Sequence, residues 1–369
     1  MIDFIKYIPS AIKIADQESY YPEFKRKTRT TRIMDNIKWI LKYGNYNYYY
    51  NMYGFDVIKD NWVNSDEYLD IRYFAITRDC LNYIGKPKYS QNAILRDKYV
   101  FYRYMKDVGM PVPEVFAVIL NGNILDLNMQ PIDIEIFKKR KCYFIKPIDG
   151  QLGTGVVFIN DYENYILNQD RFSCGRFIIQ EKIIPHSEME KLNNNSVNTI
   201  RFVTLRDRYD KARIFSGFIR LGTSNTNNVD NCAQGGLAIG INQDGSLKKY
   251  GFYNIEYGTK TMVHPDSKIE FESFKIPNYN IARDMAINAH DKYFYGLHSI
   301  GWDIAITEDG CSFLEGNDNW DTFVPQLCDR GLKNEWLNEI KQYVSDKELK
   351  KFNTFKKHPL SWLYNDGII

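Results

Sequence analysis

The sequence predicts an α+β fold with a helical region at its N-terminus. Residues 1–90 are dense in tyrosine, asparagine and lysine, and apolar side chains recur there at helical spacing, as at Ile33 and Ile37. After this region the composition shifts, and short apolar runs typical of β-strands alternate with helical segments at 96–108 and 281–295. With 369 residues, 44% of them hydrophobic, the chain is long enough for two or three packed units.

Near the C-terminal end, the stretch GWDIAITEDGCSFLEGN predicts two adjacent strands joined by a Glu-Asp-Gly turn. The pairing would bring Asp303, Glu315 and Asn317 to one end of the hairpin. Mg²⁺ in proteins takes oxygen ligands from few carboxylates and from substrate phosphates, so this set suits a magnesium-bound nucleotide. A solvated hairpin with ordinary polar residues has the same pattern, and the hairpin alone does not separate the two interpretations.

Upstream, the stretch CYFIKPIDGQLGTG places Lys146 at the end of an apolar strand and before a glycine-rich loop. Successive N–H groups of such a loop can form an anion nest, to which the lysine adds a positive charge. The loop is not a P-loop, because no Gly-Lys-Ser/Thr follows, and a structural turn between two strands has the same composition.

A further apolar strand, RFIIQEKII, carries polar groups at its end. Adenine needs one acceptor for its amino group and backbone groups for its ring edge, and a strand that leaves its sheet at Glu181 and Ile183 can offer both. An exposed Glu-Lys pair at a strand terminus is the plainer interpretation.

In this order, these pieces resemble the ATP-grasp superfamily, the ligases typified by D-alanine:D-alanine ligase. The strings FIKPIDGQLGTGVV, NTIRFVT, NCAQGGLAIGI, HPDS, IGWDIAI and FLEGN are similar to the sugar-transfer-associated ATP-grasp proteins and the related alpha-L-glutamate ligase-like proteins. The resemblance covers roughly residues 91–325. It implies an ATP-grasp fold, in which two α+β subdomains clasp ATP, with ATP and one or two Mg²⁺ ions as cofactors.

The resemblance assigns a nucleotide site residue by residue. Lys98 and Lys146 would contact the ATP phosphates, and Glu181 with the backbone near Ile183 would bind adenine. Glu188 would bind ribose. The mobile flap over the phosphates would contain Gly150, Gly153, Thr154 and Gly155, and the metal ligands would be Asp303, Glu315 and Asn317.

Two arginines and five further residues complete the predicted site. Arg201 and Arg220 lie on central strands, where arginines of the family serve the acyl phosphate, and with Lys146 they form the predicted catalytic set. Both arginines could instead be paired structural residues. The predicted substrate-binding residues are Asn198, Asn231, Gly235, Gly236 and His264, although a histidine in such a position more often caps a loop.

The predicted organisation has four parts. Residues 1–90 form the helical N-terminal region, 91–183 the first ATP-grasp subdomain with the lysines and the flap, and 184–330 the second subdomain with the arginines and the metal hairpin. Residues 331–369 form C-terminal helices. Most ATP-grasp ligases begin instead with a Rossmann-like unit that helps to shape the acceptor site. The place of the acceptor site is therefore open, and the N-terminal tyrosines are either packing residues or platforms for sugar rings.

The function that the resemblance implies is an ADP-forming carboxylate–amine ligase that works through an acyl phosphate. It would act in bacterial capsular or exopolysaccharide biosynthesis on small molecules, joining an amino acid or amine to a sugar-linked carboxylate. Because phosphorylation gives the carboxylate a leaving group, such an enzyme needs no nucleophile from the protein. The alternatives are an ATP-grasp phosphotransferase and a non-catalytic nucleotide-binding protein of polysaccharide assembly.

Composition narrows the partners and the compartment. The net charge of +2 gives no electrostatic footprint for nucleic acid, and the basic segment FKRKTRTTR is expected to be a solvated face. Without C-x-x-C spacing or a signal peptide, the six cysteines are expected to be reduced, buried thiols of a cytoplasmic protein. The opening MIDFIKYIPSAIKIA is too short and interrupted to span a bilayer and could at most lie on a membrane surface.

Overall fold

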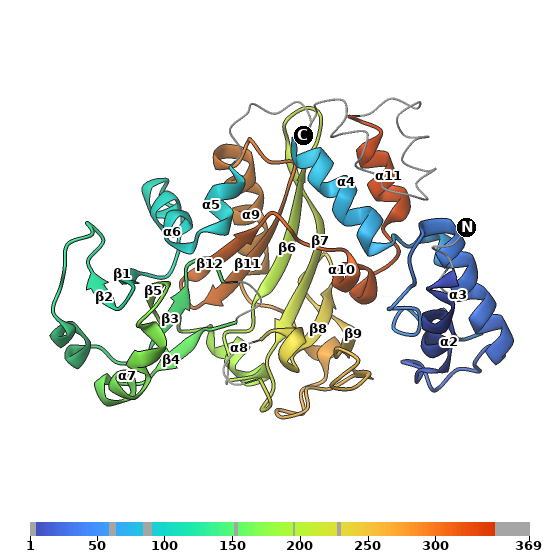
Figure 1. The fold of residues 1–369 in the computed structure, drawn as a ribbon, viewed down its shortest axis with the longest axis horizontal. Coiled ribbons are helices and arrows are strands. Elements are labelled where there is room, and N and C mark those ends of the chain that lie inside the picture. Colours follow the sequence, from blue (N-terminus) through green and yellow to red (C-terminus); the bar gives the residue numbers. More distant parts are fainter. Residues whose placement is uncertain are drawn as a thin grey trace.

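The computed structural model describes two antiparallel sheets with helices on their faces (Figure 1). This is the α+β class that the sequence predicts. The described residues are 5–58, 64–83, 91–150, 154–194, 196–226 and 230–343. Within them, no helix combines the length and the apolar character needed to cross a membrane.

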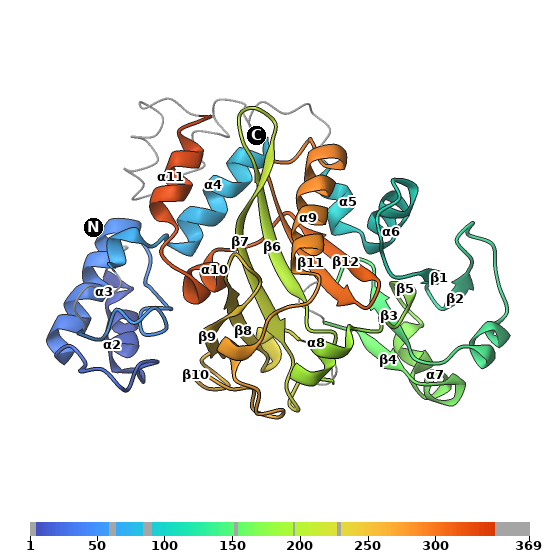
Figure 2. The same cartoon turned by 180° about the vertical axis from the view of Figure 1, so that it is seen from behind.

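A five-stranded sheet lies at one end of the molecule, opposite the N-terminal helices (Figures 1 and 2). Its half of the fold contains, in chain order, α5 (Asn92–Arg96), α6 (Lys98–Asp107), β1 (Val115–Leu120), β2 (Asn123–Leu125), η2 (Ile134–Lys139), β3 (Tyr143–Pro147), β4 (Val157–Ile159), α7 (Tyr162–Asn168), η3 (Gln169–Phe172) and β5 (Arg176–Glu181). The strand order is β2-β1-β5-β3-β4. Because successive strand residues face opposite sides, Ala117 and Ile145 pack against Phe137 on one face, whereas Val118 packs against Tyr102 of α6 on the other.

A seven-stranded sheet forms the centre of the molecule (Figures 1 and 2). Its half of the fold contains, in chain order, α8 (Ser187–Leu192), β6 (Ile200–Arg206), β7 (Ala212–Leu221), η4 (Cys232–Gln234), β8 (Leu237–Ile241), β9 (Leu247–Phe252), β10 (Lys260–Thr261), η5 (Phe271–Ser273), α9 (Tyr279–Tyr293), β11 (Ser299–Thr307), β12 (Gly310–Asn317), α10 (Phe323–Cys328) and α11 (Lys333–Ile340). The strand order is β10-β9-β8-β7-β6-β11-β12.

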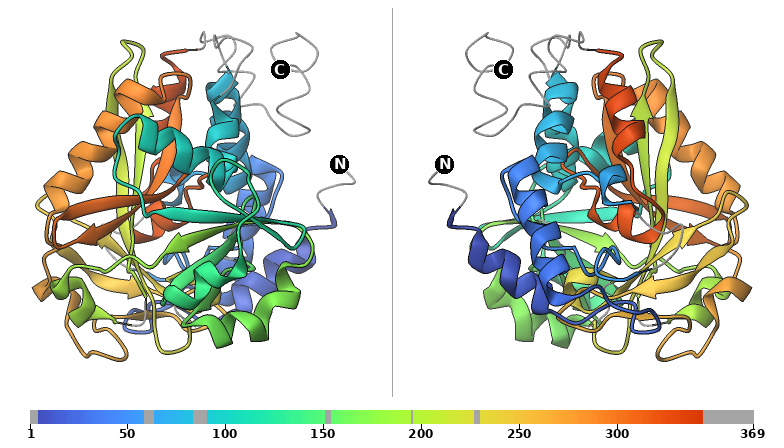
Figure 3. Two further views of the ribbon diagram at one scale, coloured as in Figure 1. Left: turned by 90° about the vertical axis from the view of Figure 1, so that its left-hand side faces the viewer. Right: turned by 90° about the vertical axis from the view of Figure 1, so that its right-hand side faces the viewer.

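The described part of the N-terminal region is helical and packs on this larger sheet. Its elements are α2 (Ile8–Asp16), α3 (Arg29–Tyr43), η1 (Ser65–Glu67) and α4 (Ile71–Tyr83). Many of its tyrosines are packing residues: Tyr20 and Tyr53 are buried in a cluster with Phe218 of β7 and Leu327 of α10. Helix α4 lies beside α11, where the Trp336 indole N–H donates a hydrogen bond to Thr77 Oγ1 at 2.8 Å (Figure 3).

The basic segment before α3 is tied to acidic side chains of the same region. Arg26 lies 2.9 Å from Asp56, Lys27 lies 2.9 Å from Asp35, and Arg29 lies 2.8 Å from Asp16. These pairs hold the N-terminal helices to their connecting loops. In the segment predicted as a solvated face, the Arg29 side chain is 60% exposed, and each of these three cations has a carboxylate partner.

Successive side chains of β6 point to opposite faces of the larger sheet. Ile200 and Phe202 point to the face covered by α9 and join the core cluster there. Val203 points to the opposite face and packs with side chains of α4 and α11. Arg201, between Ile200 and Phe202, therefore emerges on this second face. Asp303 of β11 lies opposite Arg201 in the ladder and shares that face.

Two local predictions need correction. The helix expected over 96–108 is interrupted at Asp97, whose backbone is extended and whose carboxylate accepts hydrogen bonds from the N–H groups of Tyr99 and Val100. Helix α6 therefore begins at Lys98, with Asp97 as its N-cap. The cysteines described are free, but Cys142 and Cys174 are exposed rather than buried, because they lie in the loops that flank strands β3 and β5.

Candidate active site

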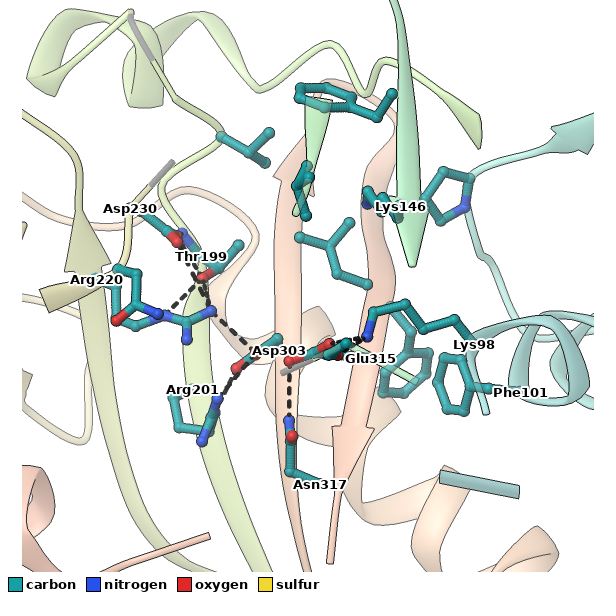
Figure 4. Close-up of a pocket in the computed structure, with 18 of the residues that line it drawn as sticks. Lys98, Phe101, Lys146, Thr199, Arg201, Arg220, Asp230, Asp303, Glu315 and Asn317 are labelled. Carbon is teal, nitrogen blue, oxygen red and sulfur yellow. Dashed lines mark hydrogen bonds and ion pairs between the residues drawn. The ribbon is translucent and has the colours of Figure 1, made fainter. Parts of the chain in front are cut away.

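A cavity of about 330 Å³ lies between the two sheets (Figure 4). Side chains of α6, β3 and β5 line it from the smaller half, and side chains of β6, β7, β11 and β12 line it from the larger half. Its size and its place between two packed units are typical of small-molecule sites. Lysine side chains line it from the smaller half, and arginine side chains line it from the larger half.

Two lysines reach the cavity from the smaller half. Lys98, the first residue of α6, donates a hydrogen bond to the Gly150 carbonyl oxygen and lies 3.7 Å from a carboxylate oxygen of Glu315. Lys146, near the end of β3, donates to Gln180 Oε1 at 2.7 Å. Burial lowers the pKa of Lys146 to about 8, although the Glu315 carboxylate opposes this shift. Lys98 from α6 and Lys146 from β3 therefore both line the cavity, where their ammonium groups can contact an anionic ligand.

Two described glycines of the segment after β3 lie close to Pro147. A Cβ atom at Gly150 would lie 2.9 Å from Pro147 Cβ, and a Cβ atom at Gly155 would lie 2.9 Å from Pro147 Cγ. Gly155 also has a left-handed φ of 75°, which disfavours other residues. Gly150 and Thr154 line the cavity, and Gly153 lies outside the described residues. The loop predicted as a phosphate flap is thus attached beside Lys98.

Arg201 and Arg220 converge on Asp303 from the larger sheet (Figure 4). Arg201 Nε donates to Asp303 Oδ1, and Arg201 Nη2 donates to Oδ2 at 2.9 Å. Arg220 Nη2 lies 2.9 Å from the same Oδ2. Asp303 is only 1% exposed, and both of its carboxylate oxygens are occupied by guanidinium groups.

The charges of this cluster reinforce one another. Burial raises the pKa of Asp303, but the guanidinium groups of Arg201 and Arg220 outweigh burial and bring the pKa down to about 2. Burial lowers the pKa of Arg220, but Asp303 and then Asp230 outweigh it, so the net shift is upward. Asp303 is therefore an anion, and Arg220 a cation, throughout the physiological pH range.

Two residues that sequence reasoning missed hold Arg220 from its other side. Thr199 Oγ1 accepts from Arg220 Nη2 at 2.8 Å and donates to Asp230 Oδ2 at 2.5 Å. Asp230 Oδ1 lies 3.7 Å from Arg220 Nη2. Thr199 precedes Arg201 by two residues, and this spacing, which places both side chains on one face, is the sequence signal that could have identified it.

The predicted hairpin is present and pairs Asp303 with Glu315 across β11 and β12. Asn317 Nδ2 donates to Glu315 Oε1 at 3.3 Å, and both side chains line the cavity. In the described part of the chain, no three acidic, histidine or cysteine side chains gather into a metal cluster. Two carboxylates and one carboxamide nevertheless have the donor chemistry that suits Mg²⁺, which draws its other ligands from phosphates and water.

The end of β5 forms the other part of the cavity. Glu181 and Ile183 line it, and a Glu181 carboxylate oxygen accepts a hydrogen bond from the Glu114 N–H at 2.8 Å. Glu188, predicted to bind ribose, is not among the lining residues. It lies in the first turn of α8 and pairs with Lys191 at 2.6 Å. The structure thus separates Glu188 from the other predicted nucleotide residues.

The residues predicted for the substrate divide in the same way. Asn231 lines the cavity, whereas Asn198, Gly235, Gly236 and His264 do not. A Cβ atom at Gly236 would lie 2.7 Å from the Asp230 carbonyl oxygen, so this glycine permits close packing of the loop. Gly235 has a left-handed φ of 97°, as a turn requires.

His264 caps its loop, which was the alternative interpretation. It is fully buried, its Nε2 lies 2.9 Å from the Gly222 carbonyl oxygen, and its Nδ1 accepts a hydrogen bond from the Asp266 N–H at 3.3 Å. Burial lowers the pKa of His264, which favours the neutral ring. The described hydrogen bonds of the His264 ring therefore go to the backbone of nearby loops, and the residue does not line the cavity.

Asn198 is a buried hub of the turn before β6. Its Nδ2 donates to the Asn193 carbonyl oxygen at 2.6 Å, its Oδ1 accepts from the Gly222 N–H at 3.3 Å, and its φ is 56°. We expect Asn198→Ala to lower the free energy of unfolding by about 3 kcal/mol, since buried partners lose their bonds and alanine disfavours positive φ. Thermal denaturation measures this loss. Nucleotide affinity of the folded variant should be unchanged, and a selective loss of affinity without loss of stability would contradict the structural role.

Comparison with known families decides the identity of the fold. Residues 168–342 match the family model described as "Sugar-transfer associated ATP-grasp". This stretch, just under half of the chain, is an ATP-grasp domain. The match includes Arg201, Arg220 and the hairpin with Asp303, whereas Lys98 and Lys146 precede it. No curated protein matches the chain.

The comparison with solved structures found, among others, three enzymes of low sequence identity to this chain. The biotin carboxylase domain of 2-oxoglutarate carboxylase from Hydrogenobacter thermophilus is 15% identical, with a TM-score of 0.41, over 69% of this chain and 46% of that chain. N5-carboxyaminoimidazole ribonucleotide synthetase from Thermotoga maritima is 14% identical, with a TM-score of 0.35, over 61% of this chain and 42% of that chain. D-alanine–D-alanine ligase from Bacillus anthracis is 12% identical, with a TM-score of 0.34, over 61% of this chain and 57% of that chain. The chain thus spans about half the length of these proteins.

Proposed function

We propose that this ATP-grasp protein is an ADP-forming carboxylate–amine ligase that works through an acyl phosphate. The observation that carries the proposal is the meeting, around one cavity, of two lysines from one half with two arginines and a carboxylate-rich hairpin from the other. Lysine ammonium groups suit phosphates as compact charges, whereas the guanidinium fork suits a planar carboxylate. The cavity therefore offers separate places for a nucleotide and for an acid.

Each group of side chains has a role in this reaction. Lys98 and Lys146 would hold the β and γ phosphates of ATP, and Arg201 and Arg220 would hold the substrate carboxylate so that its oxygen faces the γ-phosphorus. Attack by that oxygen gives an acyl phosphate and ADP, after which the amine attacks the acyl carbon and inorganic phosphate leaves. Mg²⁺, held by the hairpin carboxylates and the Asn317 amide, would neutralise charge on the phosphoryl oxygens.

The description of the matching family, sugar-transfer associated ATP-grasp, supports a link to sugar transfer, and we propose polysaccharide assembly as the setting. We place the reaction in bacterial capsular or exopolysaccharide biosynthesis in the cytoplasm, with an amino acid or amine joined to a sugar-linked carboxylate. Both substrates are then small molecules or the ends of glycan intermediates, and the arginines would select for the acid.

A trapping assay tests the chemistry. The protein is incubated with ATP, Mg²⁺ and a panel of uronic acids and amino acids, and ADP is measured with and without hydroxylamine, which intercepts acyl phosphates as hydroxamates. A ligase forms ADP and hydroxamate only when a carboxylate is present. A stable phosphorylated product that hydroxylamine does not consume would establish the phosphotransferase alternative. ATP binding without ADP formation across the panel would favour the accessory protein.

Nucleotide binding is expected to weaken as the pH rises through about 8. The pKa of Lys146 is lowered to about 8 by burial, so its ammonium group is charged below this pH and neutral above it. The charged form attracts phosphate, and affinity for ADP should therefore fall on the alkaline side. Calorimetric titration with ADP between pH 6.5 and 9.5 measures the profile. In Lys146→Met this inflection should disappear, and a variant that keeps the same inflection would assign the titration to another group.

A further inference from the structure

Asp303 has two competing tasks in the proposed mechanism. It is a predicted metal ligand on the hairpin, yet Arg201 and Arg220 occupy both of its carboxylate oxygens. Its hairpin partner Glu315 instead faces Lys98 at 3.7 Å and is one-third exposed. An oxygen that accepts from two guanidinium groups is a poor metal ligand, because the cation would have to approach through their positive charges. The two tasks therefore exclude each other in this arrangement.

Arg220 has partners other than Asp303. Arg220 is bound on its other side by Thr199 Oγ1 at 2.8 Å and by the nearby Asp230 carboxylate. The ladder fixes the backbone of Arg201 directly opposite Asp303, and the Arg201 guanidinium group bonds to Asp303. If Asp303 turned away, Thr199 and Asp230 would keep Arg220 in place, and the donors of Arg201 would be left for another carboxylate. Asp303 is itself a carboxylate, so it marks the chemistry that this fork accepts.

We propose that Asp303 occupies, in the substrate-free protein, the place of the substrate carboxylate on Arg201 and Arg220, and that the substrate displaces it toward the metal. This inference rests on the proposed function, because it assigns the arginines to the acid substrate. The consequence is cooperativity: the acid frees a metal ligand, and the bound metal keeps Asp303 away from the arginines. By linkage, each ligand strengthens the other by the same factor.

The opposing account is that the arginines permanently orient Asp303 for metal. The two accounts predict different outcomes for one measurement, the affinity of the ADP-bound protein for Mn²⁺, followed by the electron paramagnetic resonance signal of free Mn²⁺. Under exchange, Arg220→Met leaves Asp303 held by one arginine, Arg201, instead of two. Asp303 then turns to the metal more readily, and Mn²⁺ binding tightens by about tenfold, within the usual range of site-to-site coupling. Under permanent orientation, the same variant binds Mn²⁺ equally well or more weakly, which would overturn the proposal.

A double-mutant cycle separates exchange from the general effect of removing a positive charge. In an Asp303→Asn background, Arg220→Met should give no gain in Mn²⁺ affinity if the gain comes from releasing the Asp303 carboxylate. A gain that persists in this background would contradict the proposal. Arg208→Met, an exposed arginine outside the cavity, is the matched control and should leave the affinity unchanged.

Further controls keep the result interpretable. Circular dichroism and thermal melting establish folding, and if Arg220→Met does not fold, Arg220→Lys replaces it. Lysine keeps the charge but not the fork, so a smaller gain of the same sign is expected, and no gain would overturn the proposal. Natural protein that binds Mn²⁺ and ADP while the variants show no gain refutes the exchange alone. Natural protein that binds no ADP at all refutes the proposed function, and the exchange with it.

Discussion

Glu315→Gln is expected to reduce carboxylate-dependent ADP formation by at least about a thousandfold. The reason is that loss of the metal's stabilisation of the transition state raises the activation free energy by several kcal/mol. Glu315 lies opposite Asp303 in the hairpin, 3.7 Å from Lys98 and within reach of the Asn317 amide. Glutamine keeps the volume but loses the anion that holds a divalent cation. Single-turnover ADP formation measures the effect on chemistry.

The matched control for this prediction is Glu308→Gln. Glu308 lies in the turn of the same hairpin, accepts a hydrogen bond from the Ser187 N–H at 2.8 Å and does not line the cavity. Its replacement should leave ADP formation within about twofold of the natural protein, as expected for a surface change. A Glu315→Gln variant that retains full ADP formation would remove the hairpin from the mechanism.

Lys146→Met is expected to lower the rate of ADP formation by about a hundredfold, because a positive charge preorganised at a phosphoryl group acts in the transition state. Lys146 is held by its hydrogen bond to Gln180 Oε1, and Gln180 is itself fixed by donation to the Pro113 carbonyl oxygen at 3.2 Å. Methionine has similar length without the charge. The measurement is kcat and KM for ATP under saturating acid and amine.

Lys182→Met serves as the control, since Lys182 follows β5, is exposed and does not line the cavity. It should leave both kinetic constants nearly unchanged. If Lys146→Met reduced stability but not the rate per folded molecule, Lys146 would be a structural residue rather than a phosphate ligand.

Local sequence pattern was enough to predict the elements that carry the site. The hairpin with Asp303 and Glu315 follows from alternation and an Asp-Gly turn, and Lys146 at a strand end follows from a short apolar run before a proline. The ATP-grasp resemblance supplied the order of the pieces, and the family match over residues 168–342 agrees with it. These patterns lie within short stretches of sequence, so they can be recognised without knowledge of tertiary contacts.

Contacts between distant segments were not predictable in this way. The pairing of Asp303 with Arg201 depends on strand register, and the support of Arg220 depends on Thr199 and Asp230, which are distant in sequence, meeting beside it. A polar residue in a motif can face inward or outward, and sequence alone does not decide which. Asn198 shows this, because its amide lies fully buried in a turn beside the cavity.

The central claim is that this cavity is a metal-dependent ATP site, and calorimetric titration with ATP, with and without Mg²⁺, tests it most directly. The natural protein is compared with an Asp303→Asn, Glu315→Gln double variant whose folding is verified by thermal melting. We predict that Mg²⁺ strengthens ATP binding to the natural protein and that the variant loses this dependence. A folded natural protein that binds no ATP, or a variant with the same Mg²⁺ dependence, would contradict the account.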